Sequence, residues 1–246
     1  MPHPGIVDLA QPARLRRSDL PADTTALARF LVGTLLVHDH PEGRMIGRIV
    51  EAEAYPVGDA SGHAFRGQTS RNSSLFLEHG RAYVYFIYGS CYCLNVSSEA
   101  PGIGGGVLLR AVEPLEGSQL MQRNRRTSRL LDLTRGPGRL AEAFGIDRRH
   151  DGLDLCEESA AGRATSDASR LWLATDGRPV DIGVSVRIGL SRETERPLRF
   201  YVPGSPFVSG PKRLLLGGTL ASSRNVEVCL GGAGARHYVQ DFPGDR

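Results

Sequence analysis

The most informative stretches of the sequence are Ile49-Val50-Glu51-Ala52-Glu53-Ala54-Tyr55 and, further along, Tyr83-Val84-Tyr85-Phe86-Ile87-Tyr88-Gly89-Ser90-Cys91-Tyr92-Cys93-Leu94-Asn95. Both are rich in the β-branched and aromatic residues that favour strands. Gly89-Ser90 is typical of a two-residue hairpin loop, which Tyr88 and Cys91 would flank. That register puts Asn95 close to opposite Val84, on the other face from Tyr85. The two stretches therefore predict a long strand and a tight hairpin.

The sequence on either side of these stretches predicts more strands and a few helices. Asp23-Thr24-Thr25 is typical of a helix start, with Gly33 at the end of that helix. Gly136-Pro137-Gly138 predicts the start of another helix, because Pro suits a first turn. Further strands are expected over 35–38, 45–53, 105–113, 171–174, 180–189 and 198–202. The fold class that follows is α+β.

The 246 residues, 40% hydrophobic and 23% charged, have the composition of an ordinary globular protein. No internal repeat or domain linker divides the chain. We therefore expect a loose N-terminal arm over residues 1–20, one domain over 21–213, and a weakly ordered C-terminal tail over 214–246.

Charge and cysteine content limit the classes of partner. The net charge of +3 permits a polyanion partner without requiring one. The four cysteines form no metal-like pattern, and Cys91 and Cys93 would point the same way along a strand, which is poor disulfide geometry. His38 and His40 have no third ligand near them in sequence, so no metal is expected. With no signal peptide or membrane span visible, we expect a cytoplasmic protein with free thiols.

Two acids lie on one face of the first strand. Alternate residues of a strand share a face, so Glu51, Glu53 and Tyr55 point together while Ala52 and Ala54 face the other way. One interpretation is a solvent-facing strand whose acids pair with arginines. The other is a carboxylate held in a cleft on a rigid element. The two acids would have Cα atoms roughly 6.6 Å apart, which also permits a two-carboxylate glycoside hydrolase.

Taken together, several ordered blocks resemble the alkyladenine (3-methyladenine) DNA glycosylase family, the mammalian-type enzymes also found in bacteria. The blocks are 47–55, His63, 68–72, 83–89, 94–98, 106–117, Gly136-Pro137 and Arg196-Pro197-Leu198-Arg199-Phe200-Tyr201-Val202-Pro203-Gly204-Ser205-Pro206. The resemblance extends from about residue 14 to 213. It implies a single compact domain with a curved, mainly antiparallel β-sheet core, peripheral helices and a protruding β-hairpin, without metal or cofactor.

The resemblance also implies a pocket for a base. Tyr55, His63 and Tyr85 match the aromatic walls around the flipped base. Asn95 matches the pocket-side Asn that discriminates among purines. A cationic alkylated purine between such rings would gain about 0.5–2 kcal/mol from each cation–π contact.

The remaining roles implied by the resemblance concern chemistry and DNA. Glu53 matches the acid that activates water, and Tyr88 matches the hairpin residue that enters the minor groove and fills the vacated space. Arg110 matches an arginine near the phosphate of the flipped nucleotide, and Arg71 is expected to contact DNA as well. Glu51 is expected to be a structural partner, paired to an arginine.

The implied activity is that of a DNA repair glycosylase. It would flip alkylated or deaminated purines (the 3-methyladenine, 7-methylguanine and hypoxanthine class) out of duplex DNA. It would then hydrolyse the N-glycosidic bond with a Glu-activated water and leave an abasic site. We expect a monomer that acts on the nucleoid. The alternative is a non-catalytic module that binds lesions or nucleic acid, against which the intact Glu53 argues, since a binder would tolerate Gln there.

Overall fold

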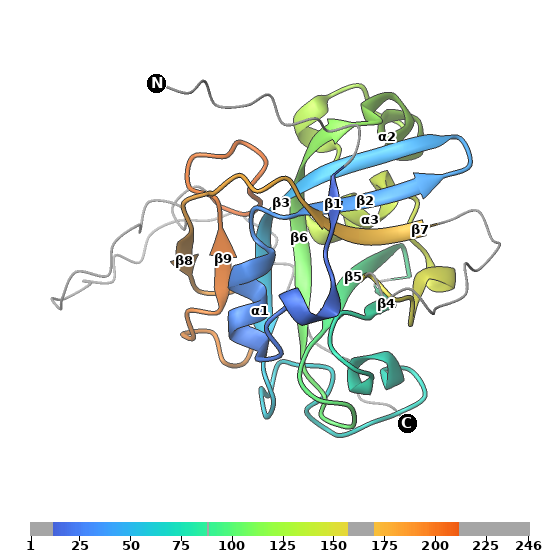
Figure 1. Ribbon diagram of the computed structural model, residues 1–246. Coiled ribbons are helices and arrows are strands. Elements are labelled where there is room, and N and C mark those ends of the chain that lie inside the picture. Colours follow the sequence, from blue (N-terminus) through green and yellow to red (C-terminus); the bar gives the residue numbers. More distant parts are fainter. Residues whose placement is uncertain (1–11, 88, 157–169, 212–246) are drawn as a thin grey trace, which may run out of the picture.

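The computed structural model describes residues 12–87, 89–156 and 170–211. In these residues the strands form a nine-stranded sheet in the order β1-β7-β2-β3-β6-β5-β4, with β9 paired to β3 and β8 paired to β9 (Figure 1). Every pair is antiparallel. The strands are β1 (Ala13–Arg14), β2 (Leu35–His40), β3 (Gly43–Tyr55), β4 (Ala82–Ile87), β5 (Cys91–Ser97), β6 (Gly106–Glu116), β7 (Arg170–Thr175), β8 (Gly183–Ser185) and β9 (Arg199–Tyr201). This confirms the α+β prediction.

The centre of the sheet is β3, the strand that carries the two acids. One edge of β3 pairs first with β2, along residues 43–48, and then with β9, along residues 51–53. Its other edge pairs with β6 over most of its length. Because β3 is hydrogen-bonded on both edges where the acids lie, their side chains are held on a rigid element.

In the part of the chain that the structure describes, three short α-helices accompany the sheet: α1 (Thr24–Leu31), α2 (Ser118–Arg125) and α3 (Pro137–Ala143). The predicted cap of α1 is confirmed, since the side chain of Asp23 accepts a hydrogen bond of 2.8 Å from the amide of Ala26. Pro137 begins α3 as predicted. Single 3-10 turns occur at η1 (Arg17–Asp19), η2 (Ser73–Phe76), η3 (Leu130–Asp132) and η4 (Arg148–His150).

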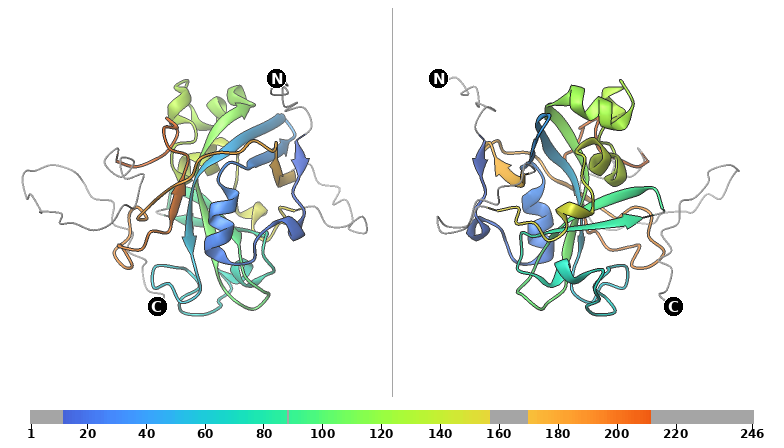
Figure 2. Two further views of the ribbon diagram at one scale, coloured as in Figure 1. Left: turned by 60° about the vertical axis from the view of Figure 1, so that its left-hand side comes forward. Right: turned by 90° about the vertical axis from the view of Figure 1, so that its right-hand side faces the viewer.

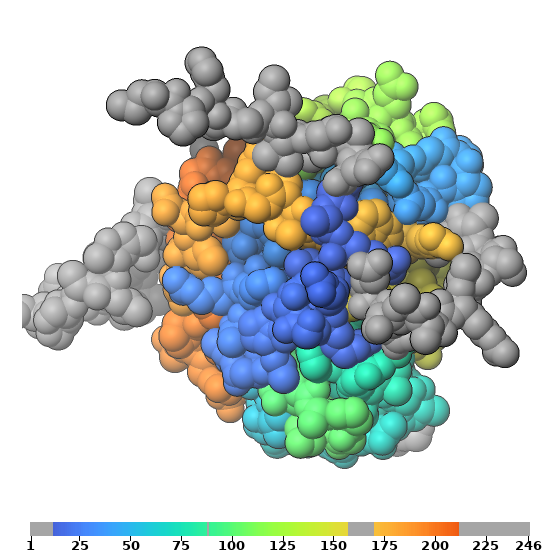
Figure 3. Space-filling view, viewed as in Figure 1, coloured from blue at the N-terminus to red at the C-terminus, as the bar shows by residue number. Residues whose placement is uncertain are grey.

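The main apolar cluster joins all three helices to the sheet. It contains Leu27 of α1, Met121 of α2 and Leu140 of α3, together with Ala52 and Ala54 of β3. The sheet curves strongly as it runs through the molecule (Figure 2). In the space-filling view, α1 and the chain just before it cover the middle of one face (Figure 3). The face of β3 that carries Ala52 and Ala54 therefore packs in the core. The face that carries Glu51 and Glu53 points to the opposite side of the strand.

Residues 12–20 are not a loose arm, so that expectation is wrong for this segment. β1 pairs with β7, and both Leu15 and Leu20 are buried. Residues 1–11, the 214–246 tail and Cys229 lie outside the described residues. The three cysteines that are described, Cys91, Cys93 and Cys156, are free thiols. No helix in the described ranges is long and apolar enough to cross a membrane.

The predicted hairpin register is wrong by one residue. Ile87 pairs with Cys91, so three residues, 88–90, connect β4 and β5 instead of two. Gly89 has a φ of +65°, a conformation that glycine adopts without steric cost. The shift places Asn95 opposite Tyr83 rather than Val84. Since side chains alternate along a strand, Asn95 lies on the same face as Tyr83 and Tyr85.

Candidate active site

Glu53 is fully buried and accepts three hydrogen bonds. Its Oε2 accepts one of 3.0 Å from the Tyr55 hydroxyl and one of 3.1 Å from Nη1 of Arg110. Its Oε1 accepts one of 2.8 Å from the backbone amide of Ile188. The interpretation of a solvent-facing acidic strand is therefore wrong, because this carboxylate lies inside the protein.

Glu51 is also fully buried but has different partners. Its Oε1 accepts hydrogen bonds from Nε of Arg110 (3.0 Å) and Nε of Arg199 (2.7 Å), and its Oε2 accepts one from the amide of Ser209 (2.6 Å). Burial by itself would raise the pKa of Glu51, but Arg110 and Arg199 outweigh it and hold the pKa below its ordinary value. The expected pairing of Glu51 with arginine is confirmed.

Arg110 joins the two carboxylates from a β-bulge. The register between β3 and β6 passes from Glu51↔Ala111 to Ala52↔Leu109, so that Arg110 has no partner opposite it. A bulge re-aims a side chain and is frequent beside active sites. Burial would lower the pKa of Arg110, but the charges of Glu53 and Glu51 raise it above its ordinary value.

Tyr55 links the acids to a pocket of about 440 Å³, a volume that includes the pocket's open mouth. Burial, and then the charge on Glu53, raises the pKa of Tyr55 well above its usual value, so its hydroxyl is a donor to Glu53. The pocket is lined by Tyr55, Pro56, Asp59, Ser61, Gly62, His63, Ala64, Phe65, Leu75, Tyr83, Tyr85, Asn95, Gly105 and Gly106. The lining thus includes all four residues predicted for base binding, namely Tyr55, His63, Tyr85 and Asn95. Glu53 is not part of the lining, but it is hydrogen-bonded to Tyr55, which is.

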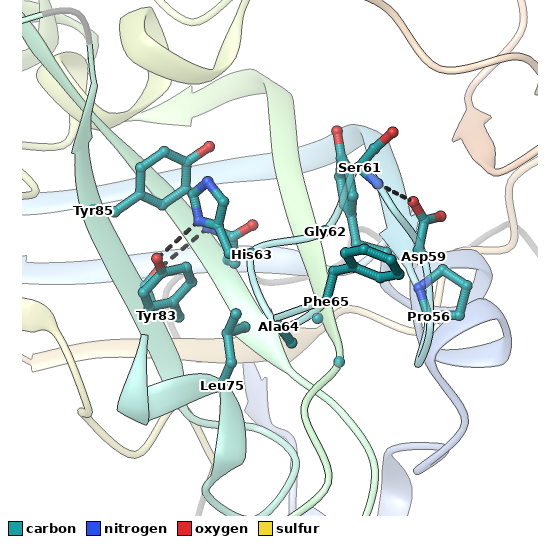
Figure 4. Close-up of a pocket in the computed structure, with 14 residues that line it drawn as sticks. Pro56, Asp59, Ser61, Gly62, His63, Ala64, Phe65, Leu75, Tyr83 and Tyr85 are labelled. Atoms are coloured by element: carbon teal, nitrogen blue, oxygen red, sulfur yellow. Dashed lines mark hydrogen bonds between the residues drawn. The ribbon is translucent and has the colours of Figure 1, made fainter. Parts of the chain in front are cut away.

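One side of the pocket is an aromatic wall. His63 lies against Tyr85 with ring centroids 4.4 Å apart, and its Nδ1 makes a hydrogen bond of 2.8 Å with the Tyr83 hydroxyl (Figure 4). Burial and the nearby charge of Arg71 lower the pKa of His63 to about 4. At neutral pH, His63 therefore presents an uncharged ring that does not repel a cation. The opposite side of the pocket in Figure 4 is formed by Pro56, Asp59 and Ser61.

Asn95 lies on the pocket side of β5 because of the one-residue shift in register. Its Nδ2 donates a hydrogen bond of 3.2 Å to the backbone carbonyl of Tyr83, which fixes the amide in the wall. The carboxyl-terminal neighbours of Asn95 pair with β6, where Gly106 also lines the pocket.

The other predicted residues are not part of the pocket lining. Arg71 donates from Nη2 to the carbonyl of Phe86, 3.3 Å away near the hairpin tip. Arg110 is 8% exposed and its side chain is directed to the two acids. Tyr88 lies outside the described residues. The roles of these three toward DNA remain predictions.

Several residues of the site were missed by the sequence analysis. Arg199 and Ser209 complete the partners of Glu51, and Ile188 supplies the amide to Glu53. Arg187 lies over the Tyr55 ring, 4.6 Å from its centroid, and forms a 2.8 Å ion pair with Asp59. A charged residue inside an apolar strand, such as Arg199 between Leu198 and Phe200, is the signal that points to a buried acid.

Among the residues that the structure describes, no group of three or more His, Cys, Asp or Glu side chains could hold a metal ion.

Comparison with known proteins shows the family of the chain. Residues 18–206 match the family described as methylpurine-DNA glycosylase (MPG). A relative from Mesorhizobium japonicum is 60% identical over 201 residues, which is 81% of this chain and 92% of the relative. One from Paraburkholderia phytofirmans is 55% identical over 203 residues, 82% of this chain and 91% of the relative. Both relatives are named as 3-methyladenine DNA glycosylases.

Proposed function

Because the chain belongs to the methylpurine-DNA glycosylase family and is a DNA glycosylase, we propose that it removes alkylated and deaminated purines from duplex DNA by base flipping. The proposed substrates are of the 3-methyladenine, 7-methylguanine and hypoxanthine class. The hydrogen bond between Tyr55 and Glu53 carries the proposal, since it joins an aromatic pocket to a buried carboxylate. The enzyme would work as a monomer on the nucleoid, in the cytoplasm.

The pocket would hold the flipped base. A base in a duplex shields its glycosidic bond, so extrusion at a cost of a few kcal/mol precedes the chemistry. Tyr88 would occupy the space left in the duplex, Arg71 would contact the DNA, and Arg110 would lie near the phosphate of the flipped nucleotide. The rings of Tyr55, His63 and Tyr85 would bind a cationic purine, each contact contributing about 0.5–2 kcal/mol. Asn95 would exclude the exocyclic amine of normal guanine.

Glu53 would orient and deprotonate the attacking water. A carboxylate offers about four acceptor positions, and three are occupied by Tyr55, Arg110 and the amide of Ile188. The remaining position would accept a hydrogen bond from the attacking water. The water oxygen would bond to C1′ as the C1′–N bond breaks, the bonding pair would leave with the purine, and the water proton would pass to Glu53. The negative charge of Glu53 would stabilise the oxocarbenium-like transition state.

The test uses duplexes with one hypoxanthine or one 7-methylguanine. Wild-type protein is expected to release the base and to leave an unbroken strand until alkali is added, whereas Glu53→Gln is expected to bind without releasing. Glu42→Gln, an exposed acid of the β2–β3 hairpin, is the matched control and should keep full activity. Release by Glu53→Gln would overturn the role of Glu53. Binding without release by the wild type would favour the lesion-binding module instead.

The glycoside hydrolase hypothesis has lost its basis. It needs two carboxylates that flank a bound sugar. Glu51 is instead buried and committed to Arg110, Arg199 and Ser209.

A further inference from the structure

Four buried charges alternate in sign beside the pocket. They are Arg199 of β9, Glu51 of β3, Arg110 of β6 and Glu53 of β3, and each contacts the next at 2.7–3.1 Å. None is more than 8% exposed. This row of four charges is neutral as a whole. Each of its two inner members, Glu51 and Arg110, interacts with two groups of opposite charge.

Within this row of charges, Glu51 fixes the orientation of the Arg110 side chain. It holds Nε of Arg110 while Nη1 reaches Glu53, and Ser209 accepts from Nη2 at 3.3 Å. Because Arg110 is the unpaired residue of a bulge, the backbone opposite does not fix its orientation. These side-chain contacts do so instead.

We propose that Glu51 is a positioning residue for the glycosylase reaction, which holds Arg110 against Glu53 and divides its charge so that Glu53 remains able to accept a proton. The inference rests on the proposed function of Glu53. Glu51 is not among the residues that line the pocket, and its carboxylate accepts hydrogen bonds from Arg110, Arg199 and the amide of Ser209. Its effect on the reaction therefore passes through Arg110.

The charged groups around Glu53 determine in which direction each substitution is expected to shift the pH dependence of base release. β6 presents Arg110 and β9 presents Arg199, while Tyr55 donates to Glu53 from its own strand. The segment that supplies the Ile188 amide also carries Arg187, whose charge is paired with Asp59. Removing the charge of Glu51 leaves Arg110 acting on Glu53 alone, which favours the ionised carboxylate and weakens it as a base. Removing the charge of Arg199 has the opposite effect.

The experiment measures single-turnover release of hypoxanthine from a duplex as a function of pH. Glu51→Gln is expected to move the acidic limb of the profile about one pH unit lower, and Arg199→Gln about one unit higher. The double variant, which restores neutrality, should return the limb close to its wild-type position. The control variant, Asp176→Asn, removes a different buried acid, which pairs with Arg48 on the same strand as Glu51. It should leave the acidic limb of the pH profile in place.

Glu51→Asp separates position from charge and keeps the cluster neutral, so it is the variant best placed to fold. Its acidic limb should stay at the wild-type pH. Its plateau rate should fall about tenfold to a hundredfold, because a misplacement of about 1 Å can have that effect. An unchanged plateau in Glu51→Asp, or limbs that do not move in opposite directions in the two Gln variants, would overturn the proposal. A failure of the proposed function is recognised separately, by an active Glu53→Gln protein.

Discussion

The hydroxyl of Tyr55 donates a 3.0 Å hydrogen bond to Oε2 of Glu53, so one side chain is both a wall of the pocket and a partner of the buried acid. The two residues are two apart on β3 and share a face. The other face of the same strand, at Ala52 and Ala54, packs in the main apolar cluster. This arrangement joins the wall of the pocket to the carboxylate through one hydrogen bond.

Tyr55→Phe tests this hydrogen bond directly, because it keeps the ring and removes only the hydroxyl. A hydrogen bond to a charged group contributes about 1.5–3 kcal/mol, so the rate of base release should fall roughly tenfold to a hundredfold. Affinity for the hypoxanthine duplex should change little. Rapid-quench rates and equilibrium binding measure the two quantities. An equal loss in both would mean that the hydroxyl serves binding instead.

Asn95→Ala should relax the choice of purine. The anchored amide of Asn95 lines the pocket, and its removal opens space for the exocyclic amine of guanine. Release of normal guanine from an undamaged duplex should rise relative to release of hypoxanthine. The comparison is made with the wild type at equal enzyme concentration. Guanine release that stays at the wild-type level would contradict the assignment of Asn95.

Gly106→Ala should narrow the pocket. A Cβ at Gly106 would lie 2.7 Å from Cδ2 of Leu75, and both residues line the pocket. Overpacking of this kind costs typically about 1–3 kcal/mol, and we expect affinity for a hypoxanthine duplex to fall about tenfold or more. Adding Leu75→Ala removes the clash. The double variant should bind more tightly than Gly106→Ala alone, and weaker binding would exclude this contact as the cause.

Stability should decrease as the pH falls below neutrality. The pKa of His38 is lowered to about 4 by burial, although the nearby carbonyl of Phe144 raises it in part. The unfolded chain binds this proton near pH 6.5, so the contribution is complete above pH 6.5 and is lost as the pH falls toward about 4. Each pH unit in that window costs at most about 1.4 kcal/mol for a buried histidine.

Urea unfolding across this window measures the effect. His38→Gln can still donate to the carbonyl of Phe144 but does not titrate. The variant should therefore show a shallower dependence of the unfolding free energy on pH than the wild type. Equal slopes in the two proteins would mean that other groups, such as His63, account for the acid sensitivity.

The local features could be predicted from the order of the amino acids. The period of two along β3 grouped Glu51, Glu53 and Tyr55 on one face, Asp23 marked the start of α1, and the ordered blocks indicated the family. These patterns depend on residues a few positions apart, so they can be read without knowledge of the fold.

The residues that meet across the sheet could be identified only from the folded structure. The hairpin has a three-residue connection, and this reversed the predicted face of Asn95, since a slip of one residue exchanges the two faces of a strand. Arg110 and Arg199 reach Glu51 from 59 and 148 residues away, and the bulge that aims Arg110 arises from pairing between β3 and β6. Contacts of this range follow from strand order and register, which the spacing of residues along the chain does not specify.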